Sequence, residues 1–180
     1  MTPTQIRFEA RLLQPEVGGK GGWTFLVLPR AASARLRTRG QTAVDGTLNG
    51  ARFKAMLDPD GKGSHWLKVS RKLRLAAGAE PQDIVAVEIV PAERAPEPRV
   101  PVDLRQALAA APAARAVWSE LTPAARHDWI LWITTAKQAA TRARRVAGAC
   151  DRLAGGKRRV CCFDRSGLYG KGISAPRALG

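Results

Sequence analysis

The stretch Val44-Asp-Gly-Thr-Leu-Asn49-Gly50-Ala-Arg-Phe-Lys-Ala-Met-Leu57 decides the fold of the first half of the chain. Apolar and polar residues alternate on both sides of Asn49-Gly50, and a period of two is typical of a half-buried strand. Asn-Gly favours a two-residue hairpin turn, because both turn positions need a positive φ and these residues tolerate it. The stretch therefore predicts a β-hairpin that turns at residues 49–50.

Four further segments have the composition of short strands, and together with the hairpin they make six. They are Ile6–Leu12, Trp23–Pro29, His65–Val69 and Ile84–Val90. Residues 31–37 have the composition of one short helix. Short strands joined by tight turns predict a closed or partly closed β-barrel, which we place at residues 1–92.

A proline-rich segment follows, with four prolines in the eleven residues 91–101. Proline lacks a backbone donor and disfavours helix at the residue before it, so residues 93–101 are predicted to be a linker. The apolar period then changes to 3.6, which predicts helices over residues 102–156. We expect these helices to be marked by caps and stops at Asp103, Pro112, Thr122, Thr141 and Gly155-Gly156. Residues 157–180 are predicted to be a basic irregular tail, and the fold class is α+β.

Positive charge is concentrated in the second half. The 180 residues carry a net charge of +15, and residues 99–180 contribute +10 of it, from 15 basic and 5 acidic side chains. Such an excess predicts an anionic partner without identifying it. There is no apolar run long enough for a transmembrane helix and no signal-peptide pattern at the N-terminus, so we expect a cytoplasmic protein.

The densest basic cluster comprises Lys137, Arg142, Arg144 and Arg145. On a helix, Arg142 and Arg145 lie on one side, and Arg144 lies about 200° from Arg142. One interpretation is a solvated helix face whose arginine stems cover apolar surface. The other is a binding site for nucleic acid, a lipid headgroup or a small acidic ligand. No motif of a nucleic-acid-binding domain accompanies the cluster.

No set of residues predicts catalysis, a metal or a cofactor. His65 is expected to pack or hydrogen-bond within a strand, and His127 points about 100° away from its neighbour Asp128 on a helix. Cys161 and Cys162 are adjacent, which is a poor spacing for metal ligands. Nearby arginines would lower the pKa of either thiol if they are close in space, so a thiol-dependent activity remains an alternative.

Both halves resemble known bacterial families. The first half resembles the β-barrel family called domain of unknown function 1905 in Trp23–Pro29, Val44–Gly50, Phe53 and Lys72–Arg74. The second half resembles the helical YdeI/OmpD-associated family in Pro101–Leu108, Trp132–Lys137 and Thr141–Arg145. The stretch Pro81-Gln-Asp83 departs from the Gly-Asp that the barrel family usually has before its last strand.

The resemblance implies a barrel of the double-split type and an association with resistance to bacteriocins or cationic peptides. Our leading hypothesis is a non-enzymatic binding protein with an anionic ligand or partner. Its expected binding residues are Lys72, Arg74, Lys137, Arg142, Arg144 and Arg145. The alternatives are nucleic-acid binding through the same surface, or thiol chemistry at Cys161 or Cys162. The sequence indicates no cofactor and leaves the oligomeric state open.

Overall fold

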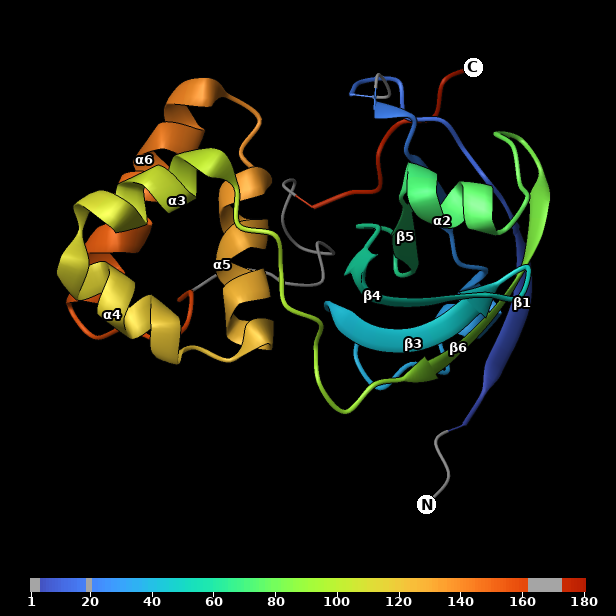
Figure 1. Cartoon of the computed structure of the whole chain (residues 1–180), viewed down its shortest axis with the longest axis horizontal. Helices are drawn as coiled ribbons and strands as arrows, with labels where there is room; N and C mark the ends of the chain where they lie inside the picture. Colours follow the sequence, from blue (N-terminus) through green and yellow to red (C-terminus); the bar gives the residue numbers. More distant parts are fainter. Residues whose placement is uncertain (1–3, 19–20, 162–172) are drawn as a thin grey trace. The chain divides into compact units, whose positions relative to one another are not determined.

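The computed structural model describes residues 4–18, 21–161 and 173–180, and its internal contacts divide the chain into two compact units (Figure 1). The first unit runs to Ala95 and includes the C-terminal residues 173–180. The second unit begins at Pro96, inside the predicted linker. Each unit has its own hydrophobic core.

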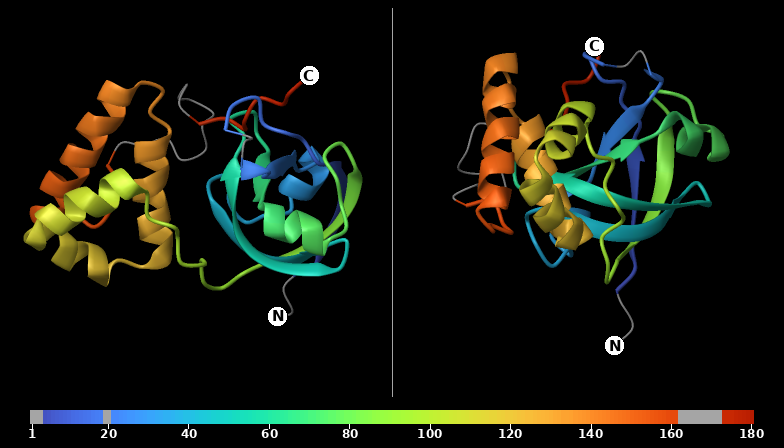
Figure 2. Two further views of the ribbon diagram at one scale, coloured as in Figure 1. Left: turned by 45° about the horizontal axis from the view of Figure 1, so that its top comes forward. Right: turned by 60° about the vertical axis from the view of Figure 1, so that its left-hand side comes forward.

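The first unit is a nearly closed six-stranded barrel, as predicted, and every neighbouring pair of strands is antiparallel. The strands are β1 (Ile6–Arg11), β2 (Thr24–Val27), β3 (Thr42–Leu48), β4 (Ala51–Pro59), β5 (His65–Val69) and β6 (Ile84–Pro91), in the order β1-β6-β3-β4-β5-β2. The strands wrap into a ring in the left view of Figure 2. Just beyond β1, Leu13 exchanges two backbone hydrogen bonds with Phe25 of β2, at 2.7 and 2.9 Å, which nearly closes the ring.

The predicted hairpin joins β3 to β4 and turns at Asn49 and Gly50, whose φ angles are 46° and 85°. Gly46 lies opposite Phe53 of β4 and Ile89 of β6. A Cβ at Gly46 would lie 2.3 Å from the carbonyl oxygen of Glu88, so only glycine allows β6 to approach β3 this closely.

Among the residues described for the barrel unit there are two short helices, whereas the sequence predicted one over residues 31–37. The first, α1, is shorter than predicted and spans Arg30–Ser33. The second, α2, spans Arg71–Ala76 and was not predicted. Ser70 caps α2, because its hydroxyl accepts a hydrogen bond from the Leu73 amide at 3.1 Å.

In the described part of the second unit, residues 96–161, there are four helices: α3 (Val102–Ala110), α4 (Pro112–Glu120), α5 (Pro123–Thr134) and α6 (Ala139–Ala154). The predicted starts at Pro112 and Thr122 are confirmed, as is the stop at Gly155. None of the helices that the structure describes is long and apolar enough to cross a membrane.

Two predicted caps are wrong. Asp103 lies inside the first turn of α3, after an N-cap at Pro101, where its carboxylate accepts from the Leu104 amide at 2.9 Å. An acidic side chain is favourable there because the helix N-terminus is electropositive. Thr141 also lies within a helix, since α6 already starts at Ala139 after Gln138.

The last eight residues, 173–180, lie along the barrel and are called the C-terminal strap below. The amide of Glu16 donates to the Arg177 carbonyl, and the amide of Leu179 donates to the Gln14 carbonyl, both at 2.8 Å. Ile173 is buried. Part of the predicted irregular tail therefore extends the hydrogen bonding of the barrel beyond β1.

Candidate anion-binding surface

Helix α6 positions the predicted arginines around a buried stripe. Val146, Ala149, Cys150 and Leu153 of α6 are buried in the core of the helical unit. This apolar stripe fixes the rotation of the helix, and the basic residues therefore lie on its flanks and its outer face.

Arg142 is bound to α3. Its Nε donates to Oδ2 of Asp103 at 2.6 Å and its Nη2 donates to Oδ1 at 3.1 Å. A two-pronged bond of this kind matches the planar guanidinium to the carboxylate. The hydrogen bonds from Arg142 lower the pKa of Asp103, so the carboxylate is held in its charged form. Both side chains remain partly exposed.

Arg145 is bound to α5 instead. Its Nη1 donates to the Trp132 carbonyl at 2.5 Å and to the Thr135 hydroxyl at 3.1 Å. The guanidinium carbon also lies 5.5 Å from the centroid of the Trp132 ring, within the range of a cation–π interaction. Arg145 thus satisfies a carbonyl in the last turn of α5 and ties the two helices together.

Arg152 also lies at Trp132, although it was not among the binding residues predicted from the sequence. Its guanidinium carbon lies 5.0 Å from the centroid of the same Trp132 ring. Arg145 and Arg152 are seven residues apart, so they lie on one face of α6 two turns apart, with Gly148 between them. The Trp132 ring approaches to 3.9 Å from the position of a Cβ at Gly148. The seven-residue spacing was the signal in the sequence.

Lys137 and Arg144 are exposed and differ from the two anchored arginines. Arg144 makes one long contact, from Nη2 to the Thr141 hydroxyl at 3.4 Å. Lys137 lies just before α6, whose first turn carries no acidic residue. The structure therefore brings Lys137, Arg142, Arg144 and Arg145 to the N-terminal half of one helix and the turn before it, which we call the α6 basic surface.

The charge balance of the helical unit is strongly positive. Residues 96–161 carry twelve Lys or Arg and five Asp or Glu. Ion pairs join Glu97 to Arg126, Asp103 to Arg142, and Glu120 to Arg158. Basic residues outnumber acidic ones by seven, so this unit retains a net positive potential whatever the pairing.

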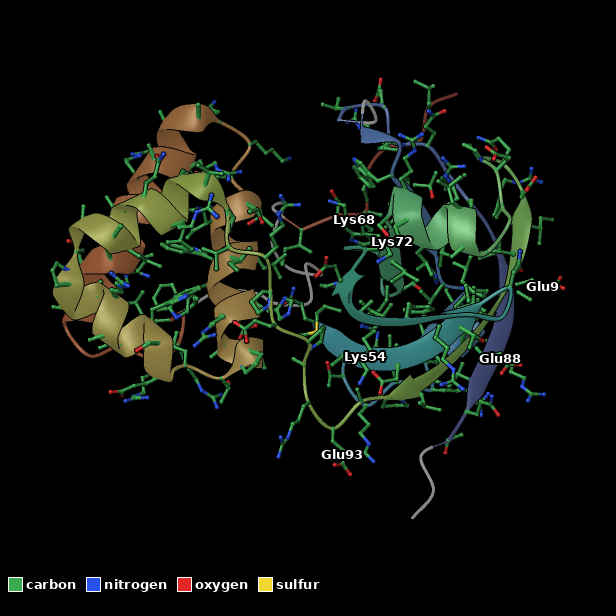
Figure 3. All side chains as sticks on the ribbon, viewed as in Figure 1. Glu9, Lys54, Lys68, Lys72, Glu88 and Glu93 are labelled. Carbon is green, nitrogen blue, oxygen red and sulfur yellow. The ribbon has the colours of Figure 1, made fainter. Side chains whose placement is uncertain are left out.

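The two candidates from the barrel differ in accessibility. Lys72 is exposed on α2 and is labelled in Figure 3. Arg74 is buried and donates from Nη1 to the Ala79 carbonyl at 3.1 Å and to Oε2 of Glu80 at 2.9 Å. These bonds stabilise the connection between α2 and β6, so Arg74 has a structural role.

Of the candidate thiols, Cys161 is exposed, and Cys162 lies outside the described residues. Cys150 is buried in the helical core. Burial, with a smaller effect of Asp151, raises the pKa of the Cys150 thiol and keeps it in the unreactive protonated form.

His65 is buried in the barrel and hydrogen-bonded, as predicted. Its Nε2 lies 2.8 Å from the Gly40 carbonyl, which can only accept, so the proton is on Nε2. The Ser33 hydroxyl then donates to Nδ1 at 2.7 Å. Burial lowers the pKa of His65, so the ring is neutral at pH 7. Within the ranges described, no three His, Cys, Asp or Glu side chains gather as a metal site would require.

Comparisons with protein families agree with this two-part architecture. Residues 8–89 match the family described as domain of unknown function 1905, and residues 97–156 match the family described as bacteriocin-protection, YdeI or OmpD-associated. No curated protein matches the chain. The first match begins within β1 and ends within β6, and the second spans α3 to α6. The chain therefore joins, in the predicted order, a barrel that matches domain of unknown function 1905 to a helical unit that matches the family described as bacteriocin-protection, YdeI or OmpD-associated.

Proposed function

We propose that the protein is a non-enzymatic cytoplasmic binding protein that captures an anionic partner on the α6 basic surface. The observation that carries the proposal is the exposed pair Lys137 and Arg144, next to two arginines that the fold holds in place. The helix N-terminus adds a partial positive charge to the same region. An anion approaching this surface meets several cations that need little reorganisation to bind it.

The anchored and the exposed residues have different tasks in this proposal. Arg142 and Arg145 connect α6 to α3 and α5, and they keep partly exposed guanidinium edges in fixed positions. Fixed donors lose less conformational entropy on binding than free ones. Lys137 and Arg144 are free to adapt to the ligand, and they provide long-range attraction that salt would screen.

The description of the matched helical family supplies a physiological setting, which is bacteriocin protection. Capture of a partner requires no nucleophile, acid or metal. A binding role is therefore compatible with the helical unit, where His127 is engaged by the Pro96 carbonyl at 2.8 Å and Cys150 is buried. We extend the protective role to this chain as part of the proposal.

A charge-reversal experiment tests the proposal without disturbing the anchored arginines. The variant Lys137→Glu/Arg144→Glu alters only exposed side chains. The matched control Arg105→Glu/Arg115→Glu alters two exposed arginines on α3 and α4 and changes the net charge equally. The probes are labelled poly-glutamate and a labelled 20-nucleotide single strand, followed by fluorescence anisotropy at about 50 mM salt, where electrostatic binding is strong.

We expect the α6 variant to bind at least one probe about tenfold more weakly than the wild-type protein, and the control to lose much less. The proposal fails if neither probe binds the wild-type protein. It also fails if the control reversal weakens binding as much as the α6 reversal, because attraction to net charge would then be sufficient.

Nucleic-acid binding through the same surface is the second candidate, favoured by the excess of seven positive charges in residues 96–161. It predicts that the logarithm of the binding constant falls linearly with the logarithm of salt concentration, through counterion release. The thiol alternative has one observation in its favour, the exposure of Cys161. Alkylation at neutral pH that is no faster than that of free cysteine would eliminate it.

A further inference from the structure

Two guanidinium groups lie close to one indole ring, that of Trp132. The guanidinium carbons of Arg145 and Arg152 both lie within 5.5 Å of the Trp132 ring centroid. The ring itself is half-buried and packs edge-on against Trp129, with the centroids 5.9 Å apart and the planes at 77°. The core therefore holds the indole in place, and both guanidinium groups lie within cation–π distance of it.

These two arginines differ from the other anchored arginines of the helical unit. Arg126, Arg142 and Arg158 each form an ion pair with a carboxylate. Neither Arg145 nor Arg152 forms an ion pair anywhere in the part of the chain that the structure describes. Asp151 is the chain neighbour of Arg152, but it points about 100° away around the helix.

Two like charges on one ring repel each other, and the negative face of the indole offsets only part of that cost. A bound anion would remove the repulsion. The pair is therefore better explained as a site that is completed by a negatively charged ligand.

The spacing of the pair restricts the ligand. The backbone positions of the two arginines are about 10.5 Å apart along the helix axis, while their guanidinium carbons lie 5.5 and 5.0 Å from one ring centroid, so a ligand with several charged groups can reach both. Arg145 uses Nη1 for the Trp132 carbonyl and Thr135, and its Nε and Nη2 have no acceptor among the residues described. The Arg152 guanidinium makes no hydrogen bond to the residues that the structure describes, and its contact there is with the Trp132 ring. An extended anion with several charged groups fits this arrangement.

We infer that Arg145 and Arg152, both held over Trp132, form a two-point site for a linear chain of phosphate groups. Guanidinium is the side-chain group best suited to phosphate, because its fork donates two parallel hydrogen bonds to two oxygens. The chain could be the backbone of a nucleic acid or a free polyphosphate. The inference rests on the proposed function and adds to it the ligand chemistry and a new residue, Arg152.

The test measures binding of a labelled polyphosphate of about 15 units and a labelled 15-nucleotide single strand, a length comparable to known single-strand binding sites. Arg152→Gln removes the charge but keeps a long side chain over the ring. Arg152→Lys keeps the charge and loses the fork. Arg115→Gln on α4 is the matched control, because it removes one exposed charge from the same unit. Circular dichroism and thermal unfolding confirm that each variant is folded.

We expect Arg152→Gln to weaken phosphate binding about fivefold, Arg152→Lys to weaken it less, and Arg115→Gln to have little effect. Binding of either polymer with this dependence supports the inference, and the tighter polymer identifies the source of the phosphates. Equal effects of Arg152→Gln and Arg115→Gln would overturn it. So would tighter binding of poly-glutamate than of both phosphate polymers.

The failure of this inference is distinguishable from that of the proposed function. If Lys137→Glu/Arg144→Glu weakens binding and Arg152→Gln does not, the α6 basic surface binds anions but the Trp132 site does not. If the wild-type protein binds none of the polymers, both proposals are wrong.

Discussion

Arg142 on α6 binds both carboxylate oxygens of Asp103 on α3, at 2.6 and 3.1 Å, although the two residues are 39 positions apart. The bond connects the first and the last helix of the unit. Arg142, which the sequence predicted to bind a ligand, is therefore already bound to a carboxylate of the protein. The most basic stretch of the chain therefore contributes both to the stability of the helical unit and to its surface charge.

Loss of this pair should destabilise the helical unit modestly. Asp103→Asn is expected to lower the free energy of unfolding by about 1 kcal/mol, because both side chains are more than a third exposed and solvent screens the interaction. A double-mutant cycle with Arg142→Gln isolates the coupling in urea unfolding. Since the pKa of Asp103 is lowered in the folded state, the stabilisation is complete above pH 4 or so and is lost as the pH falls further. A coupling that persists undiminished in acid would contradict this assignment.

His65 should make the barrel sensitive to mild acid. Its pKa is lowered by burial, so as the pH falls below about 6.5 the unfolded chain binds a proton before the folded one does. The contribution of His65 to the free energy of unfolding is therefore fully present above that pH. Below it, the free energy of unfolding falls by up to about 1.4 kcal/mol per pH unit. Hydrogen exchange of β5 amides at pH 7.5, 6.5 and 5.5 measures the effect. His65→Gln should lower the stability at pH 7.5 and remove the contribution of this group to the slope; an unchanged slope would show that other groups cause it.

Gly46 and Gly50 form a matched pair of substitutions in one hairpin. Gly46→Ala places a Cβ 2.3 Å from the Glu88 carbonyl oxygen, which is backbone and cannot move alone, so we expect a loss of about 3 kcal/mol. Gly50→Ala meets nothing within 4 Å and costs only the strain of its φ of 85°, about 1 kcal/mol. Thermal unfolding ranks the two variants. A larger effect at Gly50 would mean that β3 and β6 separate easily.

The C-terminal strap should stabilise the barrel. Ile173 is 5% exposed, so Ile173→Ala is expected to cost about 2 kcal/mol in the free energy of unfolding. Deletion of residues 173–180 should cost more, because it also removes backbone hydrogen bonds to Gln14, Glu16 and Asp60. Leu179→Ala serves as the control, since that side chain is 49% exposed. Equal stability of all three variants would show that the strap does not contribute.

The local signals in the sequence were sufficient for most of the fold. Asn49-Gly50 predicts its hairpin because the requirement for positive φ is local, and Thr122-Pro123 predicts the start of α5 for a similar reason. Helix α2 was missed because six residues are too few to show a helical period. Asp103 and Thr141 were misassigned as caps because both residue types are also accepted in a first helical turn.

The candidate surface could be predicted only in part. Helical geometry puts Arg142 and Arg145 on one side of a helix, and their partners decide what each one does. Those partners, Asp103 and Trp132, come from two different helices, so tertiary packing separates the tasks of the two arginines. The seven-residue spacing puts Arg152 on the same face of α6 as Arg145, but only packing brings that face to Trp132.

Anion capture by the α6 basic surface has a sharp signature in the salt dependence of oligonucleotide binding. Each contact between a basic residue and a single strand contributes about 0.7 to the slope of log K against log salt. Lys137→Glu/Arg144→Glu should therefore reduce the slope of the wild-type protein by about 1.4 or more, whereas Arg105→Glu/Arg115→Glu should leave it nearly unchanged. Equal slopes for the wild-type protein and the α6 variant would show that Lys137 and Arg144 do not contact the bound anion.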